Sequence, residues 1–220
     1  MQNNNPDVVI HFGAIASTGQ IREEEIYGFN VDAVRIITEI CTSENIPLVF
    51  ISSAAVYGNK NNFSVYAKTK MLAEQVICNS ANLKFNILRL VNTYGFNEIK
   101  KGDMKSVLSD MIISSLINKK IEIWKIPGIQ PGTQSRDFVH VDDVVRIISQ
   151  LVSNEIFLNY QVDLGTGDSY KFTDIAKIVI SQIEGTSIEF KAPPKYYDFK
   201  EYQIHTCADI SWMEKNSISI

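Results

Sequence analysis

Tyr66 and Lys70 lie four residues apart in a segment with helical spacing, where they could act together on a proton. A phenol has an unperturbed pKa near ~10, too high for a base at neutral pH, and a nearby ammonium lowers that pKa by stabilising the phenolate. Because residues i and i+4 share one face of a helix, both side chains can address one ligand. Ser53, near the end of an earlier apolar segment, could hold a substrate oxygen beside the phenol. The trio predicts proton transfer, although a Tyr–Lys pair alone is typical of an ordinary amphipathic helix.

The elements that would position these residues alternate along the first half of the chain. Apolar, β-branched runs predict strands within 7–14, 47–58 and 83–95. Apolar residues at helical spacing predict helices within 23–45 and 65–81. Strands that are apolar throughout favour a parallel sheet covered on both faces, and ligands bind such sheets outside the carboxyl ends of the strands. Small and polar residues gather at those ends, at 13–17, 52–53 and 92–95.

The composition narrows the class of protein. Hydrophobic residues make up 45% of the chain and charged residues 21%, as is usual for a globular protein. A net charge of −4 with scattered basic residues disfavours nucleic acid or a membrane surface as partner. The three cysteines and three histidines are dispersed, which predicts neither a disulfide framework nor a metal site. With no long apolar span and no signal-like start, we expect a cytoplasmic protein.

Several short motifs, in a fixed order over nearly the whole chain, resemble the extended short-chain dehydrogenase/reductase family. This is the family of NAD-dependent nucleotide-sugar epimerases and dehydratases. The motifs are "VIHFGA", "ISSAAVYG", "YAKTK", "LRLVNTYG", "RDFVHVDDVV" and "LGTG". The resemblance implies an α/β fold with a Rossmann-like parallel sheet, NAD or NADP as cofactor, and a nucleotide sugar as substrate.

The family's roles transfer to matching positions of this sequence. Tyr66 would be the acid/base, Lys70 would hold the cofactor ribose and lower the tyrosine pKa, and Ser53 would bind the reacting oxygen of the substrate, beside Asn92. Plain packing at the strand end is the alternative for Ser52. The residues implied along the cofactor, besides Tyr66 and Lys70, are Phe12, Gly13, Ala14, Asn30, Ser52 and Thr93.

Three further stretches, "HFGAIAST", "NTYGFNEIKKGDMKSV" and "EYQIHTCADI", resemble the ADP-glyceromanno-heptose 6-epimerases of this family, which serve lipopolysaccharide biosynthesis. Alanines stand where dehydratases usually carry an acidic pair, after Ser53, so sugar dehydration is disfavoured. The likeness implies that Lys101 is a second acid/base opposite the catalytic tyrosine, that Arg136 pairs with the substrate diphosphate, and that Tyr202 closes the sugar pocket. The alternatives are a solvated charge for Lys101, an ion pair with Asp137 for Arg136, and packing for Tyr202.

Other functions stay open at this point. The same Tyr66–Lys70 pair would serve a nucleoside-diphosphate-hexose 4-epimerase or 4-reductase. A non-catalytic binding protein that kept the fold and lost the cofactor is the alternative from another class. A homo-oligomer is a further open alternative, as helix faces in this family commonly build dimers.

The glycine-rich turn that grips a dinucleotide pyrophosphate does not occur in this sequence. Relative to the family, roughly the first sixty residues of the Rossmann domain are absent, so we expect an N-terminally truncated sheet with an exposed apolar edge. We also expect the chain alone to bind nicotinamide dinucleotide weakly. Residues 1–97 are predicted to be the remainder of the cofactor-binding domain. Residues 98–220 are predicted to form mainly a smaller substrate-binding region, with 141–167 returning to the Rossmann sheet.

Overall fold

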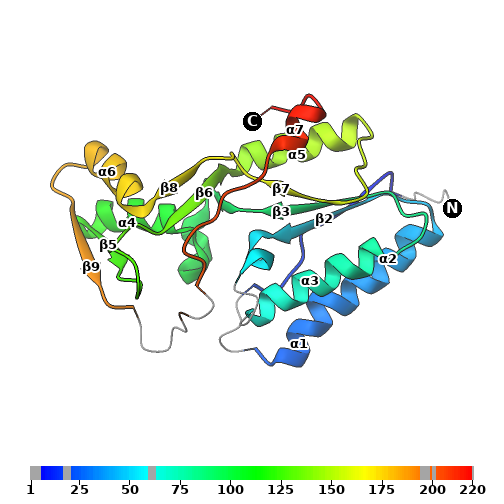
Figure 1. Ribbon diagram of the computed structural model, residues 1–220, viewed down its shortest axis with the longest axis horizontal. Helices are drawn as coiled ribbons and strands as arrows, with labels where there is room; N and C mark the ends of the chain where they lie inside the picture. Colours follow the sequence, from blue (N-terminus) through cyan, green and yellow to red (C-terminus); the bar gives the residue numbers. More distant parts are fainter. Residues whose placement is uncertain (1–5, 17–20, 59–62, 194–198, 200–201, 220) are drawn as a thin grey trace. The chain divides into compact units, whose positions relative to one another are not determined.

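The computed structural model describes residues 6–16, 21–58, 63–193, 199 and 202–219 (Figure 1). The chain divides into two compact units. Unit 1 comprises Met1–Leu90, Arg146–Leu164 and Asp209–Ile220, and unit 2 comprises Val91–Val145 and Gly165–Ala208. Strands and helices occur in both units, which confirms the predicted α/β class.

Unit 1 is built on a four-stranded parallel sheet in the order β1-β2-β3-β7. The strands are β1 (Val9–His11), β2 (Leu48–Ser53), β3 (Phe85–Leu90) and β7 (Gln161–Leu164). The first three are the strands predicted from their apolar runs, and β7 lies within the segment expected to return to this sheet. In the register of the sheet, Ser52 of β2 lies opposite Arg89 of β3.

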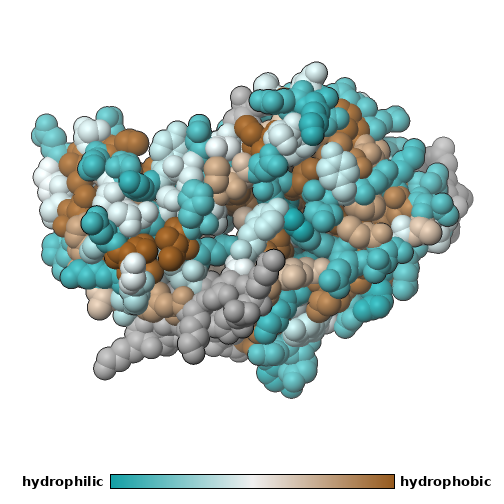
Figure 2. Space-filling model, in the orientation of Figure 1, coloured by the Kyte–Doolittle hydropathy of each residue, from teal (hydrophilic) through white to brown (hydrophobic). Residues whose placement is uncertain are grey.

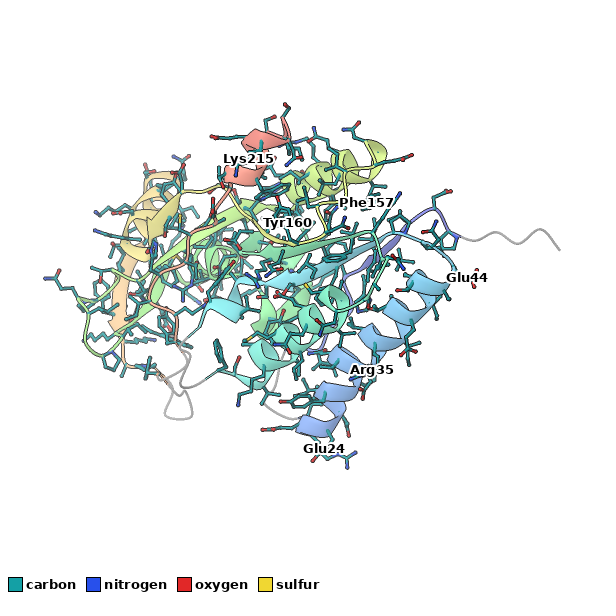
Figure 3. The ribbon with its side chains drawn as sticks, turned by 45° about the vertical axis from the view of Figure 1, so that its right-hand side comes forward. Glu24, Arg35, Glu44, Phe157, Tyr160 and Lys215 are labelled. Atoms are coloured by element: carbon teal, nitrogen blue, oxygen red, sulfur yellow. The ribbon has the colours of Figure 1, made fainter. Side chains whose placement is uncertain are left out.

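Helices cover both faces of this sheet. The helical segment predicted at 23–45 forms α1 (Glu23–Tyr27), a π-helical turn η1 (Gly28–Asp32) and α2 (Ala33–Ser43) without a break. In Figure 1, α2 lies beside α3 (Val65–Cys78) along one face of the sheet. The labelled side chains Glu24, Arg35 and Glu44 in Figure 3 lie on the solvent side of the α1–α2 segment, and all three are exposed. Their opposite face is apolar and contributes to the core.

The core of unit 1 lies between α2, α3 and the sheet. Its buried members come from helix positions spaced by one or two turns, from the strands, and from the residues that lead into β2 and β3, as an amphipathic helix on an apolar sheet requires. They are Val34, Cys41, Ile46, Leu48, Phe50, Ala73, Ile77, Leu83, Phe85 and Ile87.

Apolar side chains also reach the surface, as the brown areas of Figure 2 show. Among the described strands, β1 pairs with β2 alone, and Ile10 and Phe12 are 42% and 54% exposed. Among the described strands, β1 is thus at an edge of this sheet, with apolar side chains of this segment at the surface. Phe29, Ile36 and Ile40 are further exposed apolar residues, in the η1–α2 segment.

Unit 2 contains two smaller sheets. In the first, β4 (Asn92–Tyr94) is parallel and β8 (Ser169–Lys171) antiparallel to the central β6 (Ser135–His140). In the second, β5 (Lys120–Trp124) pairs in parallel with β9 (Ser187–Lys191). The helical elements of this unit are η3 (Glu98–Met104), α4 (Val107–Asn118) and α6 (Phe172–Gln182). Its core is formed by Met111, Ile121, Ile123, Phe138, Phe172, Ile175, Ala176 and Val179.

One element differs from the sequence-based expectation, because the single strand expected within 83–95 is two strands, β3 and β4. The compact units divide between Leu90 and Val91, while the predicted domain boundary near residue 97 stays a prediction. The tail beyond residue 208 belongs to unit 1 and carries the short helix α7 (Ser211–Lys215). Asp163 explains this return, because its carboxylate accepts a hydrogen bond from the Asp209 amide (3.0 Å) and its carbonyl accepts one from the Trp212 indole (2.6 Å).

The helix α5 (Val141–Ser153) runs from unit 2 into unit 1, and the turn η2 (Ala54–Tyr57) follows β2 directly. Among the helices of the described residues, none is long and apolar enough to cross a membrane.

Candidate functional site

The structure brings Ser53 and Tyr66 together within unit 1. Ser53 is the last residue of β2 and caps η2, with its Oγ accepting a hydrogen bond from the Ala55 amide (3.2 Å). Tyr66 lies in the first turn of α3, which begins after Ser64, whose Oγ accepts from the Ala67 amide (3.2 Å). The Ser53 hydroxyl is hydrogen-bonded to the Tyr66 phenol. A strand end and a capped helix start thus place the two predicted catalytic hydroxyls in contact.

Lys70 lies one turn further along α3 and is only 2% exposed. Its Nζ donates to the Ile51 carbonyl (2.6 Å) and lies 4.6 Å from the centre of the Phe50 ring. Burial lowers the pKa of Lys70 to about 8, against the opposing effect of the Glu74 charge. The charge of this side chain is therefore sensitive to what binds beside it near neutral pH.

The pKa of Tyr66 differs from the sequence-based expectation. Burial raises it above its ordinary value, and the Ser53 hydrogen bond opposes that rise. The expected lowering by Lys70 is not the dominant effect, because the Lys70 Nζ is 6.0 Å from the centre of the tyrosine ring and donates to Ile51. Ionisation of Tyr66 at neutral pH therefore requires a further positive charge, which an oxidised nicotinamide ring would supply.

The segment after β1 carries the residues predicted along the cofactor. Phe12, Gly13 and Ala14 are exposed, and a side chain at Gly13 would come within 3.1 Å of the His11 ring. The His11 Nε2 is a buried polar atom without a hydrogen-bond partner in the described part of the chain. An open strand end with a glycine and an unpaired polar atom fits a bound dinucleotide.

Asn30 acts on this segment from the π-helical turn η1. It is 1% exposed, its Oδ1 accepts from the Ile15 amide (2.7 Å), and its Nδ2 donates to the Ile15 carbonyl and to the Thr69 hydroxyl (both 3.0 Å). These side-chain bonds tie the segment after β1 to α3. The structure thus shows a supporting role for its side chain, while direct contact of Asn30 with the cofactor stays a prediction.

Ser52 faces the other way along β2, as alternate strand residues do. It is 2% exposed, and its hydroxyl donates to the Glu74 carboxylate (2.5 Å). The structure therefore agrees with a packing role for the Ser52 hydroxyl, the alternative to contact with the cofactor.

Three of the predicted substrate residues line one pocket of unit 2. Asn92, Arg136 and Tyr202 contribute to a pocket of about 500 Å³. Several residues that the sequence analysis did not select as site residues complete its wall. They are Lys105, Val107, Asp110, Glu122, Ile123, Trp124, Gln134 and Phe172.

Arg136 is the more buried of the two basic residues that line this pocket. It is 8% exposed, donates from Nη1 to the Ser135 carbonyl (2.8 Å), and lies 5.0 Å from the Tyr202 ring centre and 5.7 Å from that of Phe172. Burial raises the pKa of Tyr202, against the charge of Arg136 and a hydrogen bond with it. A buried guanidinium beside two aromatic rings suits a ligand that carries both an anionic group and a flat ring, such as a nucleoside diphosphate.

Asp137 was the alternative partner of Arg136, and its carboxylate holds a turn. It accepts hydrogen bonds from the amides of Thr166 (2.9 Å), Gly167 (2.9 Å) and Ala208 (3.1 Å). Asp137 thereby fixes the "GTG" turn and the segment before residue 208 onto β6, next to Arg136.

Lys101 lies in η3 of unit 2, and its side chain is 56% exposed. Its Nζ forms an ion pair with Glu98 (3.2 Å), whose buried carboxylate also accepts from the Ser106 amide and from the Ser106 and Ser109 hydroxyls. Burial raises the pKa of Glu98, but these hydrogen bonds outweigh it and hold the pKa at about 2. The predicted opposition of Lys101 and Tyr66 stays a prediction, as does the approach of Thr93, also in unit 2, to the nicotinamide.

Sequence reasoning missed a second group of polar residues in unit 1. Glu74, Arg89, Tyr57 and Asp163 form connected hydrogen bonds behind the acid/base group. Tyr57 and Arg89 stand inside the motifs "ISSAAVYG" and "LRLVNTYG", which was the only signal in the sequence that could have selected them.

Comparison with known proteins agrees with this arrangement. The model of the NAD dependent epimerase/dehydratase family matches residues 1–162. A relative from Brachyspira hyodysenteriae, ADP-L-glycero-D-manno-heptose-6-epimerase, is 30% identical over 232 residues, covering 96% of this chain and 69% of that protein.

Solved structures show the same fold. The Helicobacter pylori ADP-L-glycero-D-manno-heptose-6-epimerase has a TM-score of 0.73 at 22% identity, covering 84% of this chain and 60% of that one. A UDP-N-acetylglucosamine 4-epimerase from Methanobrevibacter ruminantium has a TM-score of 0.79 at 24% identity, covering 97% and 71%. The order of the motifs, the parallel sheet and these matches agree, and the chain belongs to the NAD-dependent epimerase/dehydratase family.

Proposed function

We propose that this chain carries the acid/base group and the substrate pocket of a nucleotide-sugar epimerase that uses NAD or NADP. The observation that carries the proposal is the hydrogen bond between Ser53 and Tyr66 with Lys70 buried one helical turn away. The chain spans 69% of the length of its Brachyspira relative and 60% of the Helicobacter structure, so activity, substrate and partners are all part of the proposal.

In the proposed reaction a sugar hydroxyl is oxidised to a ketone and reduced again from the other face. The nicotinamide, when bound, supplies the hydride chemistry. Tyr66 would take the hydroxyl proton, and Ser53 would hold the same oxygen by a hydrogen bond. Lys70 would hold the cofactor ribose, with its ammonium kept charged by that contact. Lys101 would be a second acid/base on the opposite face, which would suit an inversion.

The substrate proposal follows from the pocket of unit 2. Arg136 would bind the diphosphate through a planar set of donors, and Tyr202 with Phe172 would cover the flat or apolar parts of the ligand. The Brachyspira relative makes ADP-glyceromanno-heptose the first candidate, which would place the protein in lipopolysaccharide synthesis in the cytoplasm. A nucleoside-diphosphate-hexose 4-epimerase or 4-reductase is the second candidate.

The test is turnover of ADP-glyceromanno-heptose, UDP-glucose and UDP-N-acetylglucosamine in deuterated water, with NAD or NADP added and products followed by NMR. We expect one substrate to be inverted without deuterium at the inverted carbon, because a hydride held in the site does not exchange with solvent. Inversion with deuterium at that carbon would contradict transient oxidation. Binding of a nucleotide sugar without any turnover or dinucleotide binding would support the cofactor-free binding protein instead.

A further inference from the structure

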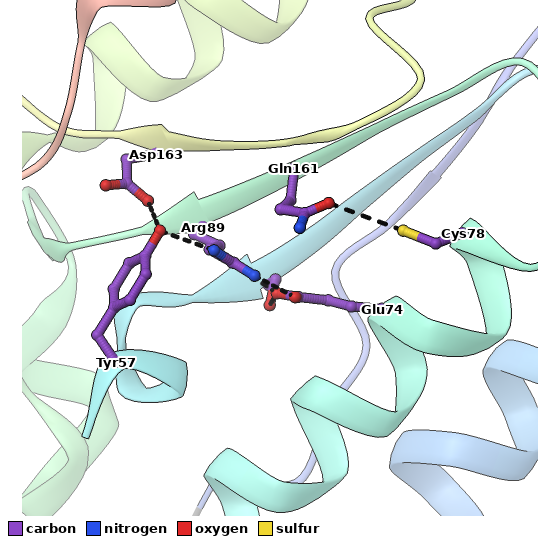
Figure 4. Close-up of polar contacts among 7 residues, drawn as sticks. Tyr57, Glu74, Cys78, Arg89, Gln161 and Asp163 are labelled. Carbon is purple, nitrogen blue, oxygen red and sulfur yellow. Dashed lines mark hydrogen bonds and ion pairs between the residues drawn. The ribbon is translucent and has the colours of Figure 1, made fainter. Parts of the chain in front are cut away.

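A chain of polar contacts, buried at Ser52, Glu74 and Asp163 and reaching the surface at Tyr57, adjoins the acid/base group in unit 1. We name its members, Ser52, Tyr57, Glu74, Arg89 and Asp163, the arginine network; Figure 4 shows the last four. Arg89 donates from Nε and Nη2 to the two oxygens of Glu74 (2.9 and 2.6 Å) and from Nη1 to the Tyr57 hydroxyl (2.7 Å). The Tyr57 hydroxyl in turn donates to Asp163 (2.6 Å). Ser52 donates to the Oε1 of Glu74 (2.5 Å).

The arginine network differs from a surface ion pair. The side chains of Arg89 and Glu74 are 16% and 7% exposed. Burial alone would lower the pKa of Arg89, but its hydrogen bonds with Glu74 and Tyr57 and their charges raise it. Burial and the hydrogen bond to Asp163 raise the pKa of Tyr57 to about 12. Removal of Arg89 or Glu74 would leave the other charge buried without its partner, which destabilises far more than loss of an exposed pair.

The members of the arginine network lie on the same elements as Ser53 and Tyr66. On the helix side, Glu74 lies one turn after Lys70 and two turns after Tyr66 in α3. On the strand side, Ser52 directly precedes Ser53 and lies opposite Arg89 in the sheet register. Tyr57 is the last residue of η2, the turn that begins immediately after Ser53.

We infer that Arg89 is a positioning residue that fixes α3 against the ends of β2 and η2 and so holds Tyr66 within hydrogen-bonding reach of Ser53. The geometry requires arginine, because three nitrogens of one planar group meet three acceptors, the two oxygens of Glu74 and the hydroxyl of Tyr57. A lysine would keep the charge but could not form this fork. The inference rests on the proposed function in one respect, because only that function gives the Ser53–Tyr66 hydrogen bond a role in catalysis.

The test compares Arg89→Gln and Arg89→Lys with Arg22→Gln, which removes an exposed ion pair with Glu25 in the same unit. Carbon-13 NMR of labelled tyrosine follows the ionisation of Tyr66 with pH, and the spectrum of Tyr66→Phe assigns its resonance. The titration covers the pH range in which circular dichroism shows that the fold is intact. Since the Ser53 hydrogen bond lowers the pKa of Tyr66, its loss in Arg89→Gln should raise that pKa further. Arg89→Lys should give a smaller shift and Arg22→Gln none. This readout needs neither cofactor nor turnover, so it decides the inference even if the proposed function fails.

A Tyr66 titration equal to wild type in folded Arg89→Gln would overturn the inference. If Arg89→Gln does not fold, Tyr57→Phe and Arg89→Lys decide in its place, because each removes only part of the arginine network, and unchanged titration in both would overturn it. Where turnover is found, kcat of Arg89→Gln should fall by about 100-fold with KM unchanged, the cost expected of a misplaced catalytic group, and Arg89→Lys should restore part of it. An unchanged kcat would exclude a role of Arg89 in the reaction.

Discussion

Lys70 in unit 1 and Lys101 in unit 2 are the two lysines to which the sequence assigned chemistry, and they lie in opposite surroundings. Lys70 is 2% exposed, donates to a strand carbonyl, and its pKa is lowered by burial to about 8. The side chain of Lys101 is 56% exposed and pairs with Glu98. One lysine is held between a helix and a sheet, and the other extends from an irregular turn.

The difference shows what controls the charge of the proposed reactive groups in each unit. In unit 1 the reactive groups stand on β2 and α3 and are fixed by buried contacts, so their protonation states depend on the packing around them. In unit 2 the Glu98 carboxylate is the buried member of the pair, and it organises the start of α4 through Ser106 and Ser109. Lys101 is thus free of the desolvation that changes the charge of Lys70, and its proposed role depends on the substrate it meets.

Replacement of Lys101 gives the largest expected effect on this comparison. If Lys101 is the second acid/base, Lys101→Ala should lower turnover of the nucleotide sugar by about 100-fold or more, the usual contribution of a positioned acid or base. Lys100→Ala is the matched control, because it removes the neighbouring exposed lysine. Turnover of Lys101→Ala within a few fold of wild type would contradict the two-base mechanism and leave Lys101 a solvated charge.

Lys70→Met should change the pH dependence of stability. Below pH 8 Lys70 is charged in both folded and unfolded chains, and the buried charge opposes folding. Between about 8 and 10.5 the folded form is neutral while the unfolded form is still protonated, so the free energy of unfolding should rise with pH. The difference between the two pKa values corresponds to at most about 3 kcal/mol.

Chemical denaturation across this pH range measures that slope. It should disappear in Lys70→Met and persist in Lys68→Met, which replaces an exposed lysine of the same helix. An unchanged slope in Lys70→Met would show that Lys70 is not the buried titrating group.

Arg136→Ala tests whether the pocket of unit 2 binds a diphosphate. Loss of charge-assisted hydrogen bonds worth about 1.5–3 kcal/mol should weaken the binding of UDP or ADP by about 10- to 100-fold. Arg136→Lys should lie between, since it keeps the charge without the fork, and Lys125→Ala removes an exposed cation of the same unit as a control. Equal dissociation constants by calorimetry for wild type and Arg136→Ala would place the diphosphate elsewhere.

Glu98→Gln should have the smallest effect. The pKa of Glu98 is lowered from 4.5 to about 2, so its stabilising contribution is complete above pH 4.5 and is lost as the pH falls through 2. At neutral pH the variant should lose about 1–2 kcal/mol of unfolding free energy, comparable with the loss of a helix cap. Glu24→Gln, at an exposed position of α1, is the control, and an equal loss in both variants would contradict the special role of Glu98.

Local patterns made part of the site predictable from the sequence. Tyr66 and Lys70 share a helix face by spacing alone, and Ser53 ends an apolar strand, so their meeting follows from a parallel sheet with a covering helix. The parallel strands β1, β2 and β3 follow equally from their uninterrupted apolar runs.

Contacts between distant residues were beyond such patterns. Tyr57 and Asp163 are 106 residues apart, and nothing in the sequence marks them as partners. The break between β3 and β4 falls at Val91, a residue with no turn signal, and the return of the tail depends on hydrogen bonds of Asp163 to distant groups. The rise in the pKa of Tyr66 was missed for a similar reason, because burial depends on the packing of the whole unit.

The most direct test of the account compares wild type with Tyr66→Phe, each saturated with NAD or NADP and with the substrate identified from the panel. We predict that Tyr66→Phe keeps its affinity for nucleotide and cofactor and loses turnover by about 1000-fold, because it lacks the phenolic hydroxyl that would take and return the proton. Turnover close to that of wild type would contradict the central claim that Tyr66, held by Ser53 beside a buried Lys70, is the acid/base of this protein.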